Sequence, residues 1–401
     1  MSTTTFQAEP GQLRKRRLRR LLLWAAGVSV FLLLLAIAVQ RLLISQMRLP
    51  RLTLTQSGTV TAVAVMPDGQ TIFTGDDSTL DGHGVTAYRP ADVFVWEATD
   101  GRLVRRLSAF HWRSSGVLTA PDGKSLIASG EACQTVHGLT PYQVIDWGWR
   151  SGQKHWMIAS GLPISLSPNG RFVGCENGVY DAANGRLVCR TSAHFAEDGQ
   201  SAFTPDGNWY GLIDDASLDP KTHKERQSSD FEGDEQYLYS TTRLHFWRTD
   251  TGKEARDFPF TRVRAFDIAH DGHWLVMASD ADDGMINGTD GSVVRRVDMQ
   301  SEKVLWTRER RSNGPNPDAA AVLNSVAISP NGKYVMLAST DNHLIVLNAQ
   351  TGRELFRPFV FPARGEVNWA IPGGLAFSAD GKTLVSRCGH KTLVWDASVL
   401  Q

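Results

Sequence analysis

The sequence predicts an all-β protein, a seven-bladed β-propeller of four-stranded blades, preceded by one transmembrane helix. Three observations support this prediction. After residue 50, apolar and polar residues alternate in runs of four to eight, as pleated strands require. In the same region, a tight-turn motif and a strand motif each recur seven times. Before it lies a stretch, residues 21–39, without any charged residue.

The N-terminal region has the pattern of a membrane anchor. Residues 1–20 form a basic tail, and residues 21–39 are long enough to span a bilayer core of about 30 Å as a helix. Because the positive charge precedes the apolar stretch, we expect a cytoplasmic tail, a retained signal anchor at 21–39, a linker at 40–50 and an extracytoplasmic propeller at 51–401. The expected location is a bacterial inner membrane, with the propeller in the periplasm.

Two alternatives concern this region. Ala36-Ile37-Ala38 has the small-x-small pattern of a signal-peptide cleavage site, so a cleaved signal peptide stays open. The basic run Arg14-Lys15-Arg16-Arg17 has a composition that can bind nucleic acid. The chain as a whole has 42 basic and 42 acidic residues, however, and produces no global positive field. We therefore expect a lipid bilayer around residues 21–39 and no nucleic acid partner.

The first recurring motif is a tight turn between two strands, in which Asp-Gly or Asn-Gly supplies the positive φ that a short hairpin needs. The copies are Pro67-Asp68-Gly69, Pro121-Asp122-Gly123, Pro168-Asn169-Gly170, Pro205-Asp206-Gly207, His270-Asp271-Gly272, Pro330-Asn331-Gly332 and Ala379-Asp380-Gly381.

The second motif is a third strand, followed in all copies but the last by another short turn. The copies begin at Val93, Val144, Val179, Leu244, Val293, Ile345 and Leu393. Each copy follows one of the first turns, so the two counts agree. A repeat of about fifty residues built from four strands predicts a propeller, with the excess over the usual 40 to 45 residues lying in loops.

The repeats resemble the tryptophan-aspartate (WD) repeat family over residues 51–401. Val394-Trp395-Asp396 matches the family signature, and Trp96, Trp147 and Trp247 occupy the corresponding place in three other repeats. The chain departs from the family in lacking the Gly-His pair before each first strand. Only Asp341 matches the aspartate that precedes the third strand.

The ring is predicted to close through the N-terminal strand. Residues 51–57 resemble the fourth strand of the first blade, residues 102–108, whereas the chain ends after the third strand of the last blade. Pairing the two would remove an exposed sheet edge that invites aggregation. The chain would then enter at the end that carries the tight turns, and the short linker would hold this end near the bilayer.

The opposite end of the propeller should carry the long loops, which are the expected partner-binding surface. We predict loops at residues 76–92, 131–141, 214–243, 310–321 and 358–372. The candidate partner-binding residues are Tyr88, Arg89, Trp112, Tyr142, Tyr237, Tyr239, Arg310, Arg311 and Trp369. Passive insertions are the alternative explanation of these loops.

No motif predicts a catalytic, metal or cofactor site. Gly-rich phosphate loops, HExxH and Gly-x-Ser-x-Gly are absent. The acidic run 280–284 begins like a calcium loop, but Gly291 stands where the twelfth-position glutamate belongs. Cys175 and Cys189 should be separated by a strand, too far apart for a disulfide, whereas Cys133 and Cys175 could pair. Most of the tryptophans should pack in the core.

These patterns favour a membrane-anchored, non-enzymatic scaffold that binds an unidentified protein partner on the extracytoplasmic side. The alternative is a propeller enzyme with a central-channel site, of a quinoprotein or lactonase-like kind. The turns at residues 181–189 and 348–356 resemble those of quinoprotein blades, and Trp156 and Trp306 follow related but damaged motifs.

Overall fold

The computed structural model describes residues 24, 28–32, 34–35, 49–77, 90–111, 113–132, 142–160, 164–175, 177–191, 200–217, 240–280, 291–311, 323–339, 343–358 and 373–400. The chain divides into two compact units, Met1–Met47 and Arg48–Gln401. In the first unit the described residues are helical, and their apolar side chains are exposed. Across the described ranges, no helix is both long and apolar enough to cross a membrane. The predicted tail, and most of the predicted span and linker, lie outside these ranges.

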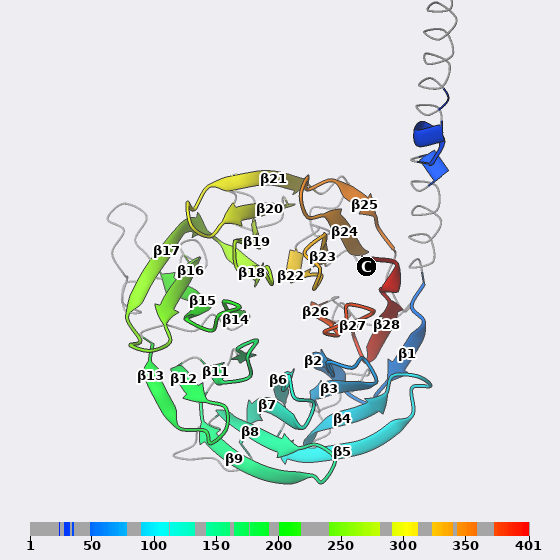
Figure 1. Ribbon diagram of the computed structural model, residues 1–401. Helices are drawn as coiled ribbons and strands as arrows, with labels where there is room; N and C mark the ends of the chain where they lie inside the picture. Colours follow the sequence, from blue (N-terminus) through cyan, green and yellow to red (C-terminus); the bar gives the residue numbers. More distant parts are fainter. Residues whose placement is uncertain are drawn as a thin grey trace, which may run out of the picture. The chain divides into compact units, whose positions relative to one another are not determined.

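The second unit contains seven four-stranded antiparallel sheets arranged around a ring, as predicted (Figure 1). In the first six blades, four consecutive strands run from the centre of the ring outwards. Blades 1 to 3 contain β2 (Thr59–Val65), β3 (Thr71–Asp77), β4 (Ala91–Glu97), β5 (Leu103–Phe110), β6 (Ser114–Thr119), β7 (Ser125–Glu131), β8 (Tyr142–Gly148), β9 (Gln153–Ala159), β10 (Ser165–Leu166), β11 (Phe172–Cys175), β12 (Gly178–Asp181) and β13 (Leu187–Arg190). Blades 4 to 6 contain β14 (Ser201–Phe203), β15 (Trp209–Ser217), β16 (Ser240–Arg248), β17 (Glu254–Thr261), β18 (Val263–Ile268), β19 (Trp274–Asp280), β20 (Gly291–Asp298), β21 (Val304–Arg311), β22 (Leu323–Ile328), β23 (Tyr334–Ser339), β24 (His343–Asn348) and β25 (Glu354–Phe356).

The seventh blade closes the ring through the N-terminal strand, which confirms the prediction. Its sheet has the order β1-β28-β27-β26, formed by β1 (Leu52–Thr55), β28 (Lys391–Asp396), β27 (Thr383–Cys388) and β26 (Gly373–Phe377). Leu52 lies opposite Val394, and Thr55 lies opposite Lys391. A 3-10 turn, η4 (Ser398–Leu400), follows β28. The first and last strands of the propeller thus share one sheet.

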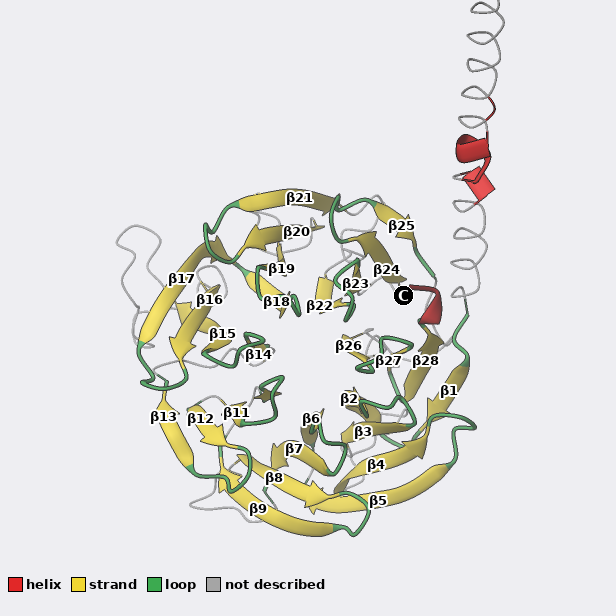
Figure 2. Cartoon of the chain, viewed as in Figure 1, coloured by secondary structure: helices red, strands yellow, loops and turns green. Residues whose placement is uncertain are grey.

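The seven first turns have one geometry, shown as short loops in Figure 2. In each, the side-chain oxygen of the Asp or Asn accepts a hydrogen bond of 2.9 to 3.0 Å from the backbone N–H two residues later. The glycine between them has a φ of 67 to 71°. Glycine adopts this left-handed conformation without the steric cost that a Cβ atom brings. The recurring Asp-Gly and Asn-Gly pairs therefore reflect the backbone conformation and the side-chain hydrogen bond of this turn.

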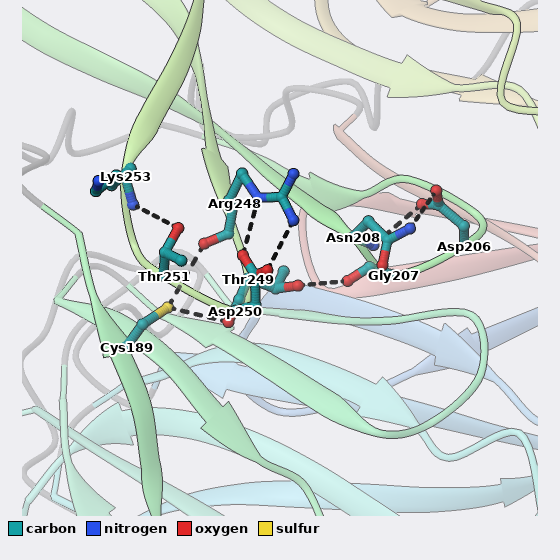
Figure 3. Close-up of polar contacts among 9 residues, drawn as sticks. All are labelled: Cys189, Asp206, Gly207, Asn208, Arg248, Thr249, Asp250, Thr251 and Lys253. Carbon is teal, nitrogen blue, oxygen red and sulfur yellow. Dashed lines mark hydrogen bonds and ion pairs between the residues drawn. The ribbon is translucent and has the colours of Figure 1, made fainter.

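The third and fourth strands meet at short second turns, which contact the neighbouring blade's turns. In blade 4, Thr249 donates its hydroxyl to the carbonyl of Gly207 at 2.8 Å, and the Cys189 thiol of blade 3 lies 3.3 Å from the carbonyl of Thr249 (Figure 3). Arg248 forms an ion pair of 2.7 Å with Asp250 in the same turn. The turns at this end are therefore linked both within a blade and between blades.

The buried apolar residues form clusters that join neighbouring blades, so the core lies between the sheets. Trp96, Trp147, Trp247 and Trp395 are all buried, at equivalent positions in the strand register, as the sequence comparison of blades predicted. The cysteine prediction also holds in part, because β12 separates Cys175 from Cys189. Cys133 lies outside the described residues.

The four tryptophans differ in how their indole N–H is satisfied. Trp96 donates to the hydroxyl of Thr74 at 3.0 Å, and Trp395 donates to Ser386 at 3.0 Å. In blade 4 the position equivalent to these hydroxyls is Leu212, and the indole N–H of Trp247 has no hydrogen-bond partner among the described residues. The hydrogen bond of the indole N–H is therefore not required, whereas the burial of the indole ring is common to all four blades.

Some residues predicted in loops belong to strands. β15 and β16 continue through the pairs Asp214 to Arg243 and Ser217 to Ser240, so the predicted loop 214–243 is shorter at both ends. Tyr142 is the first residue of β8, and Arg310 and Arg311 are the last two of β21. Backbone pairing extends these strands beyond the hydrophobic pattern of their central residues.

Candidate functional site at the loop end of the propeller

The two ends of the propeller carry different connections. Because neighbouring strands are antiparallel, the links from second to third strands and the links between blades leave one end, here called the loop end. The first and second turns lie at the opposite, tight-turn end. Arg51, just before β1, donates to the carbonyl of Ala98 in a tight turn of blade 1 at 3.0 Å. The chain therefore enters the propeller at the tight-turn end, as predicted.

Three of the nine predicted partner-binding residues fall within the described part of the chain. They are Tyr142 on β8 and Arg310 and Arg311 on β21, all at the loop end and all on strands rather than in loops. The other six lie outside the described residues, and these are Tyr88, Arg89, Trp112, Tyr237, Tyr239 and Trp369. The structure does not bring Tyr142 together with the two arginines, because they belong to blades 2 and 5.

Tyr142 lies at a polar rim shared by blades 1 and 2. It pairs in register with Glu131, whose backbone N–H and C=O bond to Arg113 and His111 at 3.1 and 2.9 Å. Arg113 also forms an isolated bridge with Asp77 of blade 1. Burial raises the pKa of Glu131; Arg113 and His111 act against this effect, and the charge of Asp77 adds to it. The rim is therefore a mixed-charge cluster at the boundary of two blades.

Arg310 lies in an arginine-rich seam between blades 5 and 6. Glu354 of β25 accepts from Arg308 of β21 at 2.7 Å and from Arg357 at 2.9 and 3.1 Å. Burial alone would raise the pKa of Glu354, but the hydrogen bonds and charge of Arg357 and the charges of Arg308 and Arg310 lower it. Three guanidinium groups thus act on one carboxylate. We call these four residues the arginine seam.

Sequence inspection missed Arg308, Glu354 and Arg357. One signal was available for the first of these, because Arg308 and Arg310 are two residues apart and must lie on the same face of a strand. Their acidic partner is 46 residues from Arg308 along the chain, and only the docking of two blades brings it into contact.

The centre of the ring contains one unusual carboxylate, Asp267 on the innermost strand β18. The equivalent positions of the other innermost strands hold no charge, and they are Ala64, Leu118, Ser165, Ala202, Ala327 and Ala376. Asp267 accepts the backbone N–H groups of Ile268 at 2.8 Å and of Ile328, in blade 6, at 2.7 Å. Burial raises its pKa to about 6, and these two hydrogen bonds act against that rise.

The contacts of Asp267 join two blades and do not constitute a catalytic array. Although part of the residue borders solvent, its carboxyl group is enclosed by protein atoms. Within the described ranges, no group of three His, Cys, Asp or Glu side chains could hold a metal ion. The acidic run 280–284 lies outside them except for Asp280, which pairs with Arg264 at 2.5 Å.

The two tryptophans that resemble quinoprotein motifs have a packing role. Trp156 of blade 2 donates to the carbonyl of Ala182 in blade 3 at 2.9 Å, and Trp306 of blade 5 donates to Ala349 in blade 6 at 2.8 Å. A Cβ atom added at Gly352 would lie 2.8 Å from the ring of Trp306, so the ring rests directly on that turn. These tryptophans hold adjacent blades together at the tight-turn end.

Comparison with known proteins agrees with this architecture. Residues 49–86 match the family described as WD domain, G-beta repeat. The matched segment spans β1, β2 and β3, and includes Thr74, the hydroxyl partner of Trp96. No curated protein matches the chain. The match and the seven-bladed ring together support a WD-repeat propeller, a kind of fold that generally mediates protein–protein interaction.

Proposed function

We propose that this protein is a membrane-anchored, non-enzymatic scaffold that binds a protein partner on the extracytoplasmic side through the loop end of its propeller. The observation that supports the proposal is that the two ends of the propeller carry different connections. The chain enters at the tight-turn end, where short turns bond to one another, while the long connections leave from the opposite end. A membrane tether at the entry point would leave the loop end accessible to a partner.

Two further features support the tethered arrangement. Residues 21–39 carry no charge and follow a basic tail, which is the pattern of a signal anchor with a cytoplasmic N-terminus. The described helical residues of this stretch expose large apolar side chains, including Trp24 at 75 % and Phe31 at 64 % exposure. Such exposure favours contact with lipid or protein over water.

The first experiment captures partners of the full-length protein by crosslinking in its own membrane. A variant replaces residues 218–239 with a short Gly-Ser link, so that β15 and β16 keep their full length. A second variant replaces residues 281–290 in the same way, and thermal unfolding of both variants checks that the propeller is intact. We expect a specific partner that the wild type captures and at least one loop variant loses. Equal capture by all three proteins would refute binding through these loops.

The side of the membrane is tested separately. A C-terminal alkaline phosphatase fusion should be active, because the enzyme folds only outside the cytoplasm, and a C-terminal green fluorescent protein fusion should be dark. The opposite pair of results would place the propeller in the cytoplasm. Release of the protein from membranes by high salt alone would contradict the anchor.

A further inference from the structure

We propose that a basic strip on the outer circumference of blades 7, 1 and 2 binds the anionic phospholipid headgroups of the bilayer in which the chain is anchored. This inference deepens the proposed function and rests on it, because only an anchored chain would hold the strip beside a bilayer. The contact would fix which part of the ring faces the membrane surface. The strip is here called the basic rim, and its residues are Arg51, Arg102, Arg105, Arg106, Arg150 and Lys154.

The basic rim begins where the chain enters the propeller. The strands β1, β5 and β9 are the outermost strands of three consecutive blades (Figure 1). Arg51, the residue before β1, donates to the carbonyl of Ala98 in the second turn of blade 1 at 3.0 Å. Arg105 of β5 donates to the carbonyl of Ser151 in the second turn of blade 2 at 3.3 Å. These two contacts between blades join the rim from the point of entry to blade 2.

The bases of the rim are held by carbonyls and aromatic rings more than by carboxylates. Among the described residues, the one ion pair of the rim joins Arg102 to Glu97 at 4.0 Å. Arg248 of blade 4, by contrast, pairs with Asp250 at 2.7 Å. An aromatic ring attracts a cation but does not neutralise its charge, so the charge stays available to an anion. Charged groups lie 4.5 to 5.9 Å from ring centroids in the pairs Arg106 with Phe94, Arg150 with Trp149 and Lys154 with Trp147.

The acidic residues around the rim do not cancel its charge. On the outermost strands and second turns of blades 1 and 2, the acids are Glu97 and Asp100. Residues 40–50 add Arg41 and Arg48 and no acid. The first turns of blades 7, 1 and 2 and the end of β28 add Lys124, Lys382, Asp68, Asp122, Asp380 and Asp396. Together these segments hold ten bases and six acids. The other acids of blades 1 and 2 belong to the loop end, except Asp146, which is buried and pairs with His155 at 2.9 Å.

Exposed apolar side chains adjoin the basic rim. Val104 of β5 and Met157 of β9 are 43 % and 59 % exposed, and Leu49, in the segment before β1, is 67 % exposed. At a membrane surface, headgroups attract bases while the boundary of the acyl chains accommodates apolar groups. The mixture therefore favours a bilayer surface over a soluble acidic polypeptide.

The test measures backbone hydrogen exchange of the full-length protein in vesicles of phosphatidylcholine alone and in vesicles that also contain phosphatidylglycerol. The outermost strand of a blade leaves its outer N–H groups unpaired, so their exchange reports on a surface that covers them. One variant combines Arg106→Gln with Lys154→Gln, and a second carries Arg102→Gln alone. Arg248→Gln is the matched control, because Arg248 is an exposed arginine at the tight-turn end that already has a carboxylate partner. Thermal unfolding checks that each variant folds.

We expect phosphatidylglycerol to slow exchange several-fold in β5 and β9 of the wild type and to leave β17, the outermost strand of blade 4, unchanged. Each base near an anionic surface contributes about a fivefold factor to binding, so the double variant should lose nearly all of this protection, Arg102→Gln part of it and Arg248→Gln none. The proposal would be overturned by equal exchange of β5 and β9 in both kinds of vesicle, by equal slowing in β17, or by full protection in the double variant.

An octaglutamate peptide, added to the phosphatidylcholine vesicles, tests the other class of ligand. If this peptide protects β5 and β9 and phosphatidylglycerol does not, the rim is a site for an acidic polypeptide and the lipid proposal is wrong.

The outcome can be separated from that of the proposed function. If alkaline carbonate releases the protein from the vesicles while phosphatidylglycerol still slows exchange in β5 and β9, the rim binds lipid and the proposed anchor fails. If the protein resists extraction but its outermost strands exchange alike in both kinds of vesicle, the anchor stands and the basic rim is excluded as a lipid contact.

Discussion

Replacing Asp267 by Asn should change how the stability of the propeller depends on pH. The folded-state pKa of Asp267 is about 6, raised from 3.8 mainly by burial. A carboxyl group whose pKa is higher in the folded than in the unfolded state binds its proton more tightly when folded. Its contribution to stability is therefore complete below pH 4 and is lost as the pH rises through 6.

The magnitude follows from the shift. About two pK units at about 1.4 kcal/mol each correspond to roughly 3 kcal/mol between pH 4 and pH 7. Asparagine does not titrate, so the free energy of unfolding of Asp267→Asn, relative to wild type, should rise by that amount over the interval. The loss of one hydrogen-bond acceptor adds an offset that does not depend on pH.

Urea unfolding followed by tryptophan fluorescence, from pH 4 to pH 8, measures this difference. Taking the difference between variant and wild type removes the contribution of the other carboxylates. Asp298→Asn is the control, because hydrogen bonds from Ser301 lower the pKa of this exposed carboxyl group. A lowered pKa places the loss of its contribution below about pH 4, so the relative stability of this variant should stay nearly constant over the measured interval. A pH-independent difference for Asp267→Asn, or one that falls with pH, would refute the account of Asp267.

The remaining predictions concern the blades and their closure. Glu302 has a φ of 58° at the position where other second turns have glycine, so Glu302→Gly should raise the free energy of unfolding by about 0.5 to 1 kcal/mol; an unchanged or lower melting temperature would contradict the assigned strain. Trp306→Ala should lower the free energy of unfolding by about 2 to 3 kcal/mol through lost packing on Gly352 and a lost hydrogen bond to Ala349, and urea unfolding would show no such loss if blades 5 and 6 were loosely packed there. Leu54→Ala should cost about 2 to 4 kcal/mol because Leu54 of the closing strand is 3 % exposed, whereas Thr53→Ala, on the exposed face of β1, should cost little; similar midpoints for both would argue against closure by β1 in solution.

Turn chemistry made most of the fold predictable from the sequence. The seven Asp-Gly or Asn-Gly turns are determined locally, by the positive φ of the glycine and the side-chain hydrogen bond of the preceding residue. Such turns can be recognised in the sequence before the fold is known. Closure was predictable for a related reason. Residues 51–57 carry a strand pattern, and the fourth strand of the seventh blade was the one strand that the repeats left unassigned. The ends of β15, β16 and β21 were not predictable, because pairing across a sheet extended them beyond their hydrophobic pattern.

The candidate site depended on contacts that no local pattern encodes. Arg310 was selected from the sequence for its charge, yet its acidic neighbour belongs to the next blade. Asp267 gave no signal, since an aspartate in an inner strand resembles any solvated residue until the backbone of Ile328 is placed against it. Such groups become visible only when the ring fixes which strands face one another.

The two ends of the propeller follow different physical constraints. At the tight-turn end, glycines such as Gly352 are fixed both by their positive φ and by a neighbouring ring that leaves no room for a side chain. Little sequence change is compatible with that packing. At the loop end, by contrast, β21 ends in two arginines, Arg310 and Arg311, and no tight turn joins it to the next blade.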